Sequence, residues 1–122
     1  MSEPDHESVL DLETIATLKA LGGTDEPDLF VELVDLFVSD TKTHIAALQR
    51  ALDQHDLRLL ERTAHTLKSS CANVGAVAMS RLCSEIEQLG RASKIEGAAQ
   101  LVERTAAQYE RVQAALIEQK VA

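Results

Sequence analysis

The chain has 122 residues, of which 45% are hydrophobic and only 2% aromatic, and it carries a formal net charge of -8. This length allows one domain whose core needs neither disulfides nor a metal, and the low aromatic content leaves Leu, Val, Ile and Ala to fill that core, as suits packed helices. The acidic charge argues against a nucleic-acid partner, because phosphate backbones are bound by clustered Lys and Arg.

The N-terminal part of the chain predicts a tail followed by two helices. Residues 1–10 are polar and acidic and are expected to form a flexible tail, whereas residues 11–122 are expected to form one helical bundle. A short helix from about residue 11 to 21 ends at a pair of glycines. A second helix, from about residue 27 to 53, follows a Thr-Asp-Glu-Pro sequence typical of helix N-termini. Its first half is apolar nearly all round, so we expect the short helix to cover it as a lid.

Three further helices are predicted, from about residue 56 to 73, from about 76 to 92 and from about 95 to 119. Each has one apolar stripe at helical spacing. The stripes are Leu60, Ala64, Leu67, Cys71 and Val74; Met79, Leu82, Ile86 and Leu89; and Leu101, Thr105, Tyr109, Val112 and Leu116. Short connections make neighbouring helices antiparallel. The predicted fold is therefore all-α, an antiparallel up-down-up-down four-helix bundle with an extra short N-terminal helix.

The sequence around the two cysteines and around three of the four histidines does not indicate a metal site or a catalytic site. Cys71 and Cys83 fall on predicted core stripes without the spacing of zinc ligands, so we expect buried free thiols. His6 lies in the tail, His44 at the edge of a core stripe and His55 in a connection. The chain also lacks a basic and apolar leader and an apolar run of membrane-spanning length. We expect a cytoplasmic monomer with no metal and no membrane partner.

His65 differs from the other histidines because it lies off the apolar stripe of its helix. Residues three and four positions away share its face. These neighbours are Glu61, Arg62, Lys68 and Ser69. The imidazole is therefore expected near solvent, among charges and a small hydroxyl. Spacing alone favours a solvated helix face that has no chemical role.

The twelve residues from His65 to Ala76 read HTLKSSCANVGA. This string resembles the active-site motif of histidine-containing phosphotransfer (HPt) domains, in which a histidine is followed by an apolar residue, a lysine, a run of small residues and Gly-Ala. The family usually has glycine at the position of Ser69, where it leaves room for the phosphoryl group and the partner's surface. Serine is also small, so Ser69 is assigned the same clearance beside His65.

The resemblance implies the same bundle, with the reactive histidine on an exposed face, and it implies a phosphorelay intermediate. His65 would accept a phosphoryl group from an aspartate of a receiver domain, often on a hybrid sensor kinase, and pass it to the receiver of a response regulator. The Mg²⁺ is expected on the receiver, so no cofactor is expected here. The chain has no Gly-rich phosphate loop and no acidic cluster for magnesium. We therefore expect no ATP site and no kinase activity of its own.

Lys68 lies one helical turn after His65 and is expected to compensate phosphoryl charge. On a solvated face, its replacement by alanine should change the free energy of unfolding by no more than about 0.5 kcal/mol. Glu61, Arg62, Ser70 and Ala72 are predicted to form the receiver docking face.

Two other functions are compatible with the helices. The first is a non-catalytic helical adaptor that docks receiver domains without phosphotransfer, although the presence of both His65 and Lys68 argues against it. The second is a metal-binding bundle, which needs Glu-x-x-His pairs pointing inward. Glu61 and His65 are predicted to face outward and have no second pair.

Overall fold

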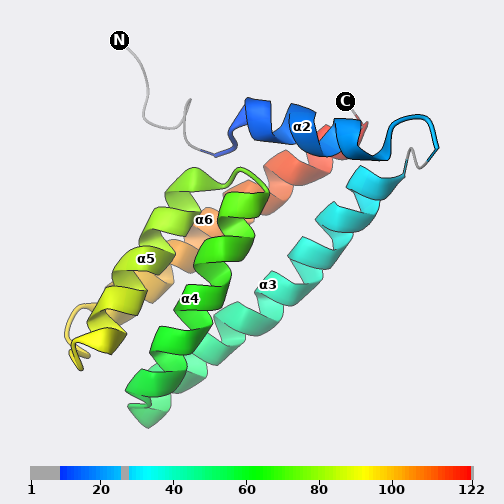
Figure 1. Ribbon diagram of the computed structural model, residues 1–122. Helices are drawn as coiled ribbons and strands as arrows, with labels where there is room; N and C mark the ends of the chain where they lie inside the picture. Colours follow the sequence, from blue (N-terminus) through cyan, green and yellow to red (C-terminus); the bar gives the residue numbers. More distant parts are fainter. Residues whose placement is uncertain (1–8, 26–27, 122) are drawn as a thin grey trace.

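The computed structural model describes residues 9–25 and 28–121, which form five α-helices and no strand. The helices are α2 (Leu12–Gly22), α3 (Leu29–Gln54), α4 (Leu57–Asn73), α5 (Val77–Arg91) and α6 (Ala98–Val121). Helices α3 to α6 run alternately up and down, and α2 lies across one end of the bundle (Figure 1). The predicted all-α up-down-up-down bundle with an extra N-terminal helix is confirmed.

Local signals in the sequence set most helix ends. The side chains of Asp11 and Asp56 cap α2 and α4 by accepting backbone N–H groups at 3.1 Å and 3.0 Å. The start predicted for α3 falls partly on residues 26–27, outside the described residues, and the Asp28 side chain makes no capping bond. At the other end of α3, His55 has a φ of 54°, in the left-handed region that usually favours glycine.

The core lies where the apolar stripes predicted it. Leu60, Ala64, Leu67 and Cys71 are buried on α4, and Val74 is buried directly after its end. On α5 and α6 the stripes are also buried, except that Leu89 and Leu101 are half-buried and pack against the core. Cys71 and Cys83 are buried free thiols, as expected. None of the helices in the described parts of the chain is long and apolar enough to cross a bilayer.

The lid helix α2 contacts the ends of several helices and not only α3. The backbone N–H of Asp11 donates to the carbonyl of Gly75, after α4, at 2.8 Å. Gly75 has a φ of +79°, and a Cβ there would lie 3.0 Å from the Asp11 carbonyl oxygen. Lys19 lies 5.4 Å from the ring centroid of Phe30 and donates to Gln119 of α6 at 3.1 Å. Of the predicted tail, residues 1–8 lie outside the described residues, whereas residues 9–10 pack against the core.

Candidate functional site

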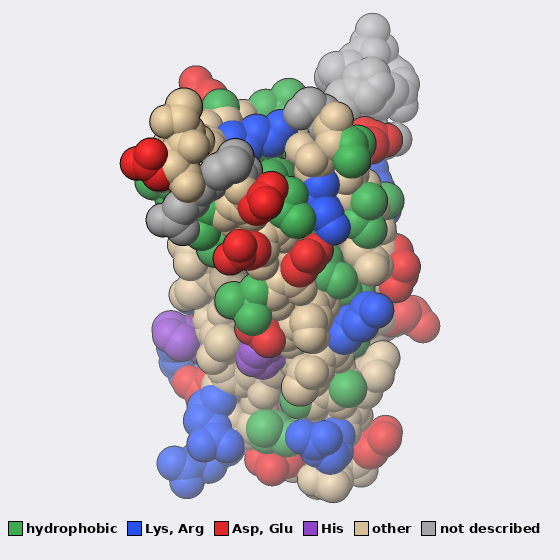
Figure 2. Space-filling view, turned by 90° about the vertical axis from the view of Figure 1, so that its right-hand side faces the viewer, with side chains coloured by type: hydrophobic (Ala, Val, Ile, Leu, Met, Phe, Trp, Pro, Cys, Tyr) green, Lys and Arg blue, Asp and Glu red, His purple; other side chains and the backbone are tan. Residues whose placement is uncertain are grey.

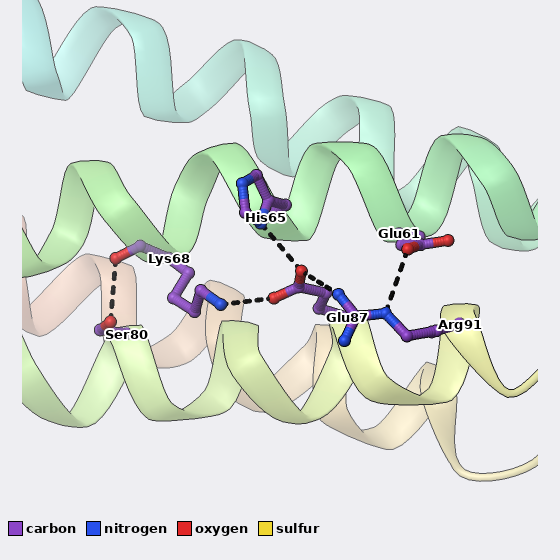
Figure 3. A network of polar contacts seen from close by, with 6 residues as sticks. All are labelled: Glu61, His65, Lys68, Ser80, Glu87 and Arg91. Carbon is purple, nitrogen blue, oxygen red and sulfur yellow. Dashed lines mark hydrogen bonds and ion pairs between the residues drawn. The ribbon is translucent and has the colours of Figure 1, made fainter.

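His65 projects from the middle of α4 with 62% of its side chain exposed, as its position off the core stripe predicted. Its Nδ1 lies 2.8 Å from Oε2 of Glu87 on α5 (Figure 3). An ionised carboxylate only accepts hydrogen bonds, so Nδ1 carries the proton and donates it. In the neutral ring this leaves the lone pair on Nε2, which makes no hydrogen bond to any residue that the structure describes.

Glu87 is the centre of the polar network between α4 and α5. Only 4% of its side chain is exposed, and it contacts Lys68 Nζ at 2.7 Å and Arg91 at 2.8 Å in addition to His65. The hydrogen bond from Lys68 lowers the pKa of Glu87; burial opposes that shift, and the hydrogen bond from His65 adds to it. Glu87 is therefore a buried anion at neutral pH, held by three donors.

Close packing of α4 against α5 brings these groups together. Ser80 Oγ on α5 donates to the carbonyl of Lys68 on α4 at 2.9 Å. Gly90 lets the helices approach, because a Cβ there would lie 2.9 Å from Cβ of Glu61 and 3.0 Å from its Cα. Arg91 reaches back to the Glu61 carboxylate at 3.4 Å. A larger residue at Gly90 would therefore separate the helices that carry His65 and its carboxylate partner.

The environment of Lys68 differs from the one expected from the sequence. Lys68 was expected on a solvated face, but its side chain is only 35% exposed and its ammonium group is paired with the buried Glu87. The lysine is therefore part of an ion-pair network, and the small stability effect expected from a surface lysine does not apply.

A hollow of about 440 Å³ lies beside His65 between α4 and α5. Its lining residues are Glu61, Arg62, His65, Thr66, Glu87 and Arg91. Arg62 is exposed there and forms no ion pair with a described residue. In residues 9–25 and 28–121, no group of three or more His, Cys, Asp or Glu side chains is placed to hold a metal ion. The hollow therefore offers an arginine and an imidazole to a group approaching from solvent.

The other predicted site residues lie on two surfaces. Ser69 is exposed one turn beyond His65, and Ala72 is exposed further along the same face of α4. Ser70 instead lines a separate groove of about 150 Å³ between α3 and α4, together with Leu36 and His44. The structure thus brings Glu61 and Arg62 together with His65 but turns Ser70 toward α3.

Sequence reasoning missed Glu87, although a signal was present. Glu87 follows Cys83 by four residues and precedes Gly90 by three, so it occupies the core stripe of α5. A charged residue on such a stripe is rarely buried without a partner. A search for cations on the neighbouring helix would have linked it to Lys68, which the motif had already singled out.

Comparison with known proteins places this geometry in a family. The sequence model of the Hpt domain family matches residues 32–115. The chain is 29% identical over 93 residues to multistep phosphorelay regulator 1 of Schizosaccharomyces pombe and 30% identical over 95 residues to histidine-containing phosphotransfer protein 2 of Arabidopsis thaliana. These matches cover 76% and 75% of this chain but only 32% and 61% of the two relatives.

Solved structures agree on the fold. The crystal structure of histidine-containing phosphotransfer protein B from Pseudomonas aeruginosa PAO1 superposes with a TM-score of 0.85 at 28% identity, over 98% of this chain and 96% of that one. The histidine-containing phosphotransfer protein MtHPt2 of Medicago truncatula has a TM-score of 0.81 at 22% identity, over 95% and 82% of the two chains, and supports the fold alone. With the family match over residues 32–115 and an exposed histidine in the motif, the chain belongs to the Hpt domain family of phosphorelay histidine phosphotransfer proteins.

Proposed function

We propose that this chain is a phosphorelay intermediate in which Nε2 of His65 accepts a phosphoryl group from a receiver-domain aspartate and passes it to another receiver. The observation that carries the proposal is an exposed imidazole whose Nδ1 is held by the buried Glu87 carboxylate at 2.8 Å. The two relatives, one named for a multistep phosphorelay and the other for histidine-containing phosphotransfer, support the same role.

The proposed transfer uses the two ring nitrogens of His65 differently. Nε2 forms a bond to phosphorus while the bond from phosphorus to the aspartyl oxygen breaks, and the aspartate leaves as a carboxylate. Because Nδ1 keeps its proton, the phosphorylated ring is positively charged, and the Glu87 carboxylate beside it stabilises that charge. Onward transfer forms a new P–O bond, breaks the N–P bond and returns a neutral ring. No proton enters or leaves the imidazole in either step.

Three further side chains have proposed roles. Lys68 compensates charge on the phosphoryl oxygens, and its 2.7 Å contact with Glu87 fixes its position one turn from His65. Arg62 lines the hollow beside His65 and adds a second cation, while Ser69 leaves clearance on the approach to the ring. We propose that Mg²⁺ is supplied by the receiver and that this chain needs no cofactor and no kinase activity of its own.

We propose that receivers of hybrid sensor kinases and of response regulators dock over the exposed face of α4 around His65, on both sides of the ring. The hollow with Glu61 and Arg62 lies on one side of the ring, and the groove with Ser70 lies toward α3. Leu36, beside that groove, is 59% exposed. Figure 2 views the α3 side of the molecule, where apolar side chains reach the surface among acidic ones. With the exposed Ala72, these residues offer a receiver both apolar and polar contacts.

The test is transfer of label from a panel of phosphorylated receiver domains. Wild-type chain should acquire a label that is acid-labile and alkali-stable, as a phosphoramidate is, and His65→Gln should acquire none. His55→Gln, at an exposed histidine that ends α3, is the matched control and should be labelled normally. Label on His65→Gln would contradict the proposal. Receiver binding without any label on the wild type would favour the adaptor function instead.

A further inference from the structure

A second groove lies between α5 and α6, away from His65. It has a volume of about 430 Å³, and the small side chains of Ala78 on α5 and Ala107 on α6 leave it open. Three arginines line it: Arg81 on α5, and Arg104 and Arg111 on α6. The side of α5 that carries Glu87 faces α4 instead, as its contact with Lys68 shows. The groove and the phosphotransfer site therefore lie on opposite sides of α5.

The groove is locally basic on an acidic chain. Arg81, Arg104 and Arg111 are all exposed, and none forms an ion pair with any residue in the described ranges. Only Glu85 among the lining residues is acidic. The whole chain carries a net charge of -8, and acidic side chains are prominent on the α3 side (Figure 2). Three unpaired guanidinium groups around one groove favour an anionic ligand.

The size and shape of the groove distinguish between anionic ligands. Arg104 and Arg111 are two helical turns apart, a rise of about 10 Å, which is longer than a single phosphate or carboxylate. Arg81 also lines a second, adjoining hollow of about 480 Å³, where Leu12 and Val77 are exposed. Asp11 and Glu13 line this second hollow as well, so its charge repels carboxylates and favours apolar groups there. A ligand that fills both parts must carry several negative charges at one end and apolar groups at the other.

We propose that the groove and the adjoining hollow together form a second binding site, which takes an acidic, amphipathic segment of a partner protein. Carboxylates of the segment pair with the three arginines, and its apolar side chains cover Leu12 and Val77. Because α5 separates the groove from Glu87 and His65, the segment and a receiver can be bound at the same time. The site would then attach the chain to a partner without blocking phosphotransfer, and the proposal does not depend on the phosphotransfer chemistry.

The experiment uses a designed probe and two matched double variants. The probe is an amphipathic peptide of about 14 residues, built of Glu and Leu at helical spacing, and binding is followed by amide chemical shifts of the full chain. Arg104→Glu with Arg111→Glu removes two groove cations. Arg50→Glu with Arg58→Glu makes the same change in net charge at exposed arginines outside the groove. Wild type and the control should show shifts in α5 and α6, whereas the groove variant should bind about tenfold more weakly, equivalent to about 1.4 kcal/mol.

Several results would overturn the proposal. Absence of shifts in α5 and α6, or equal weakening in both double variants, would reduce the groove to general surface charge. Inorganic tripolyphosphate that binds more tightly than the peptide and displaces it would assign the groove to a small polyanion. Phosphotransfer to His65 should be equal in wild type and both variants. A specific loss of transfer in the groove variant would make the groove part of receiver docking and remove the second site.

Discussion

Replacing Lys68 by methionine tests the polar network most directly. The substitution keeps the length of the side chain but removes the ammonium group that lies 2.7 Å from the buried Glu87 carboxylate. Removing one partner of a fully buried ion pair costs about 3–5 kcal/mol. Here the lysine is 35% exposed, and the carboxylate keeps Arg91 and His65 as partners. We therefore expect a loss of about 1–2 kcal/mol in the free energy of unfolding at neutral pH.

The loss should depend on pH with a defined sign. The hydrogen bond from Lys68 is the foremost cause that lowers the pKa of Glu87 in the folded chain. A carboxyl group with a lowered folded-state pKa stabilises the protein above its ordinary pKa of about 4.3, and this stabilisation is lost as the pH falls through the folded-state value. The difference in the free energy of unfolding between wild type and Lys68→Met should therefore be largest near neutral pH, and it should shrink as the pH falls below about 4.3.

The assay is urea-induced unfolding followed by circular dichroism at neutral and at acidic pH. Lys42→Met is the matched control, because Lys42 is exposed on α3 and has no ion pair with a described residue. Its free energy of unfolding should fall by no more than about 0.5 kcal/mol at either pH. Equal losses for the two variants at neutral pH, or a Lys68→Met loss that does not change with pH, would refute the role of the network in stability.

Three other predictions follow from the packing. Ser69→Gly should transfer the phosphoryl group as well as wild type, and its free energy of unfolding should fall by about 0.5–1 kcal/mol. Ser69→Leu should fold but fail to bind receivers, and normal binding by this variant would exclude docking over this face. Gly90→Ala should lower the melting temperature despite the better helix propensity of alanine, because its Cβ would lie 2.9 Å from Cβ of Glu61; a more stable variant would contradict this. Cys71 and Cys83 are both buried, and a hydrogen bond with Cys83 and burial also raise the pKa of the Cys71 thiol. Both cysteines should therefore react with a thiol reagent only on unfolding, and rapid labelling of the native protein would contradict this.

The bundle could be predicted from the sequence because apolar periodicity reports burial directly. Leu60, Leu67 and Cys71 recur at helical spacing, and burying them requires neighbouring helices. The exposure of His65 followed from the same pattern, since a residue off the stripe of a packed helix faces solvent. Periodicity gives no information about which helices are neighbours at a given height. The pairing of Lys68 with Glu87, across two helices, was therefore not predicted.

The position of the lid shows a similar limit. The apolar first half of α3 correctly predicted that the short helix α2 packs on it. The same pattern did not predict that the start of α2 would also be fixed to the connection between α4 and α5. That placement depends on Gly75, whose positive φ and missing Cβ admit the Asp11 backbone. In the sequence, Gly75 is explained by the end of α4 alone. Its second role depends on a contact between residues 64 positions apart, which no local pattern contains.

The polar network around Glu87 explains how the exposed His65 can hold one orientation. A surface imidazole without a partner rotates between rotamers, and each nitrogen can face an incoming group. In this chain the ring of His65 is held through Nδ1 by a carboxylate that is itself fixed in the core by Lys68 and Arg91. The orientation of the proposed nucleophile is therefore set from inside the bundle and does not depend on the receiver. Residues that never approach the phosphoryl group, such as Gly90 at the α4–α5 contact, should accordingly affect the rate of transfer as well as stability.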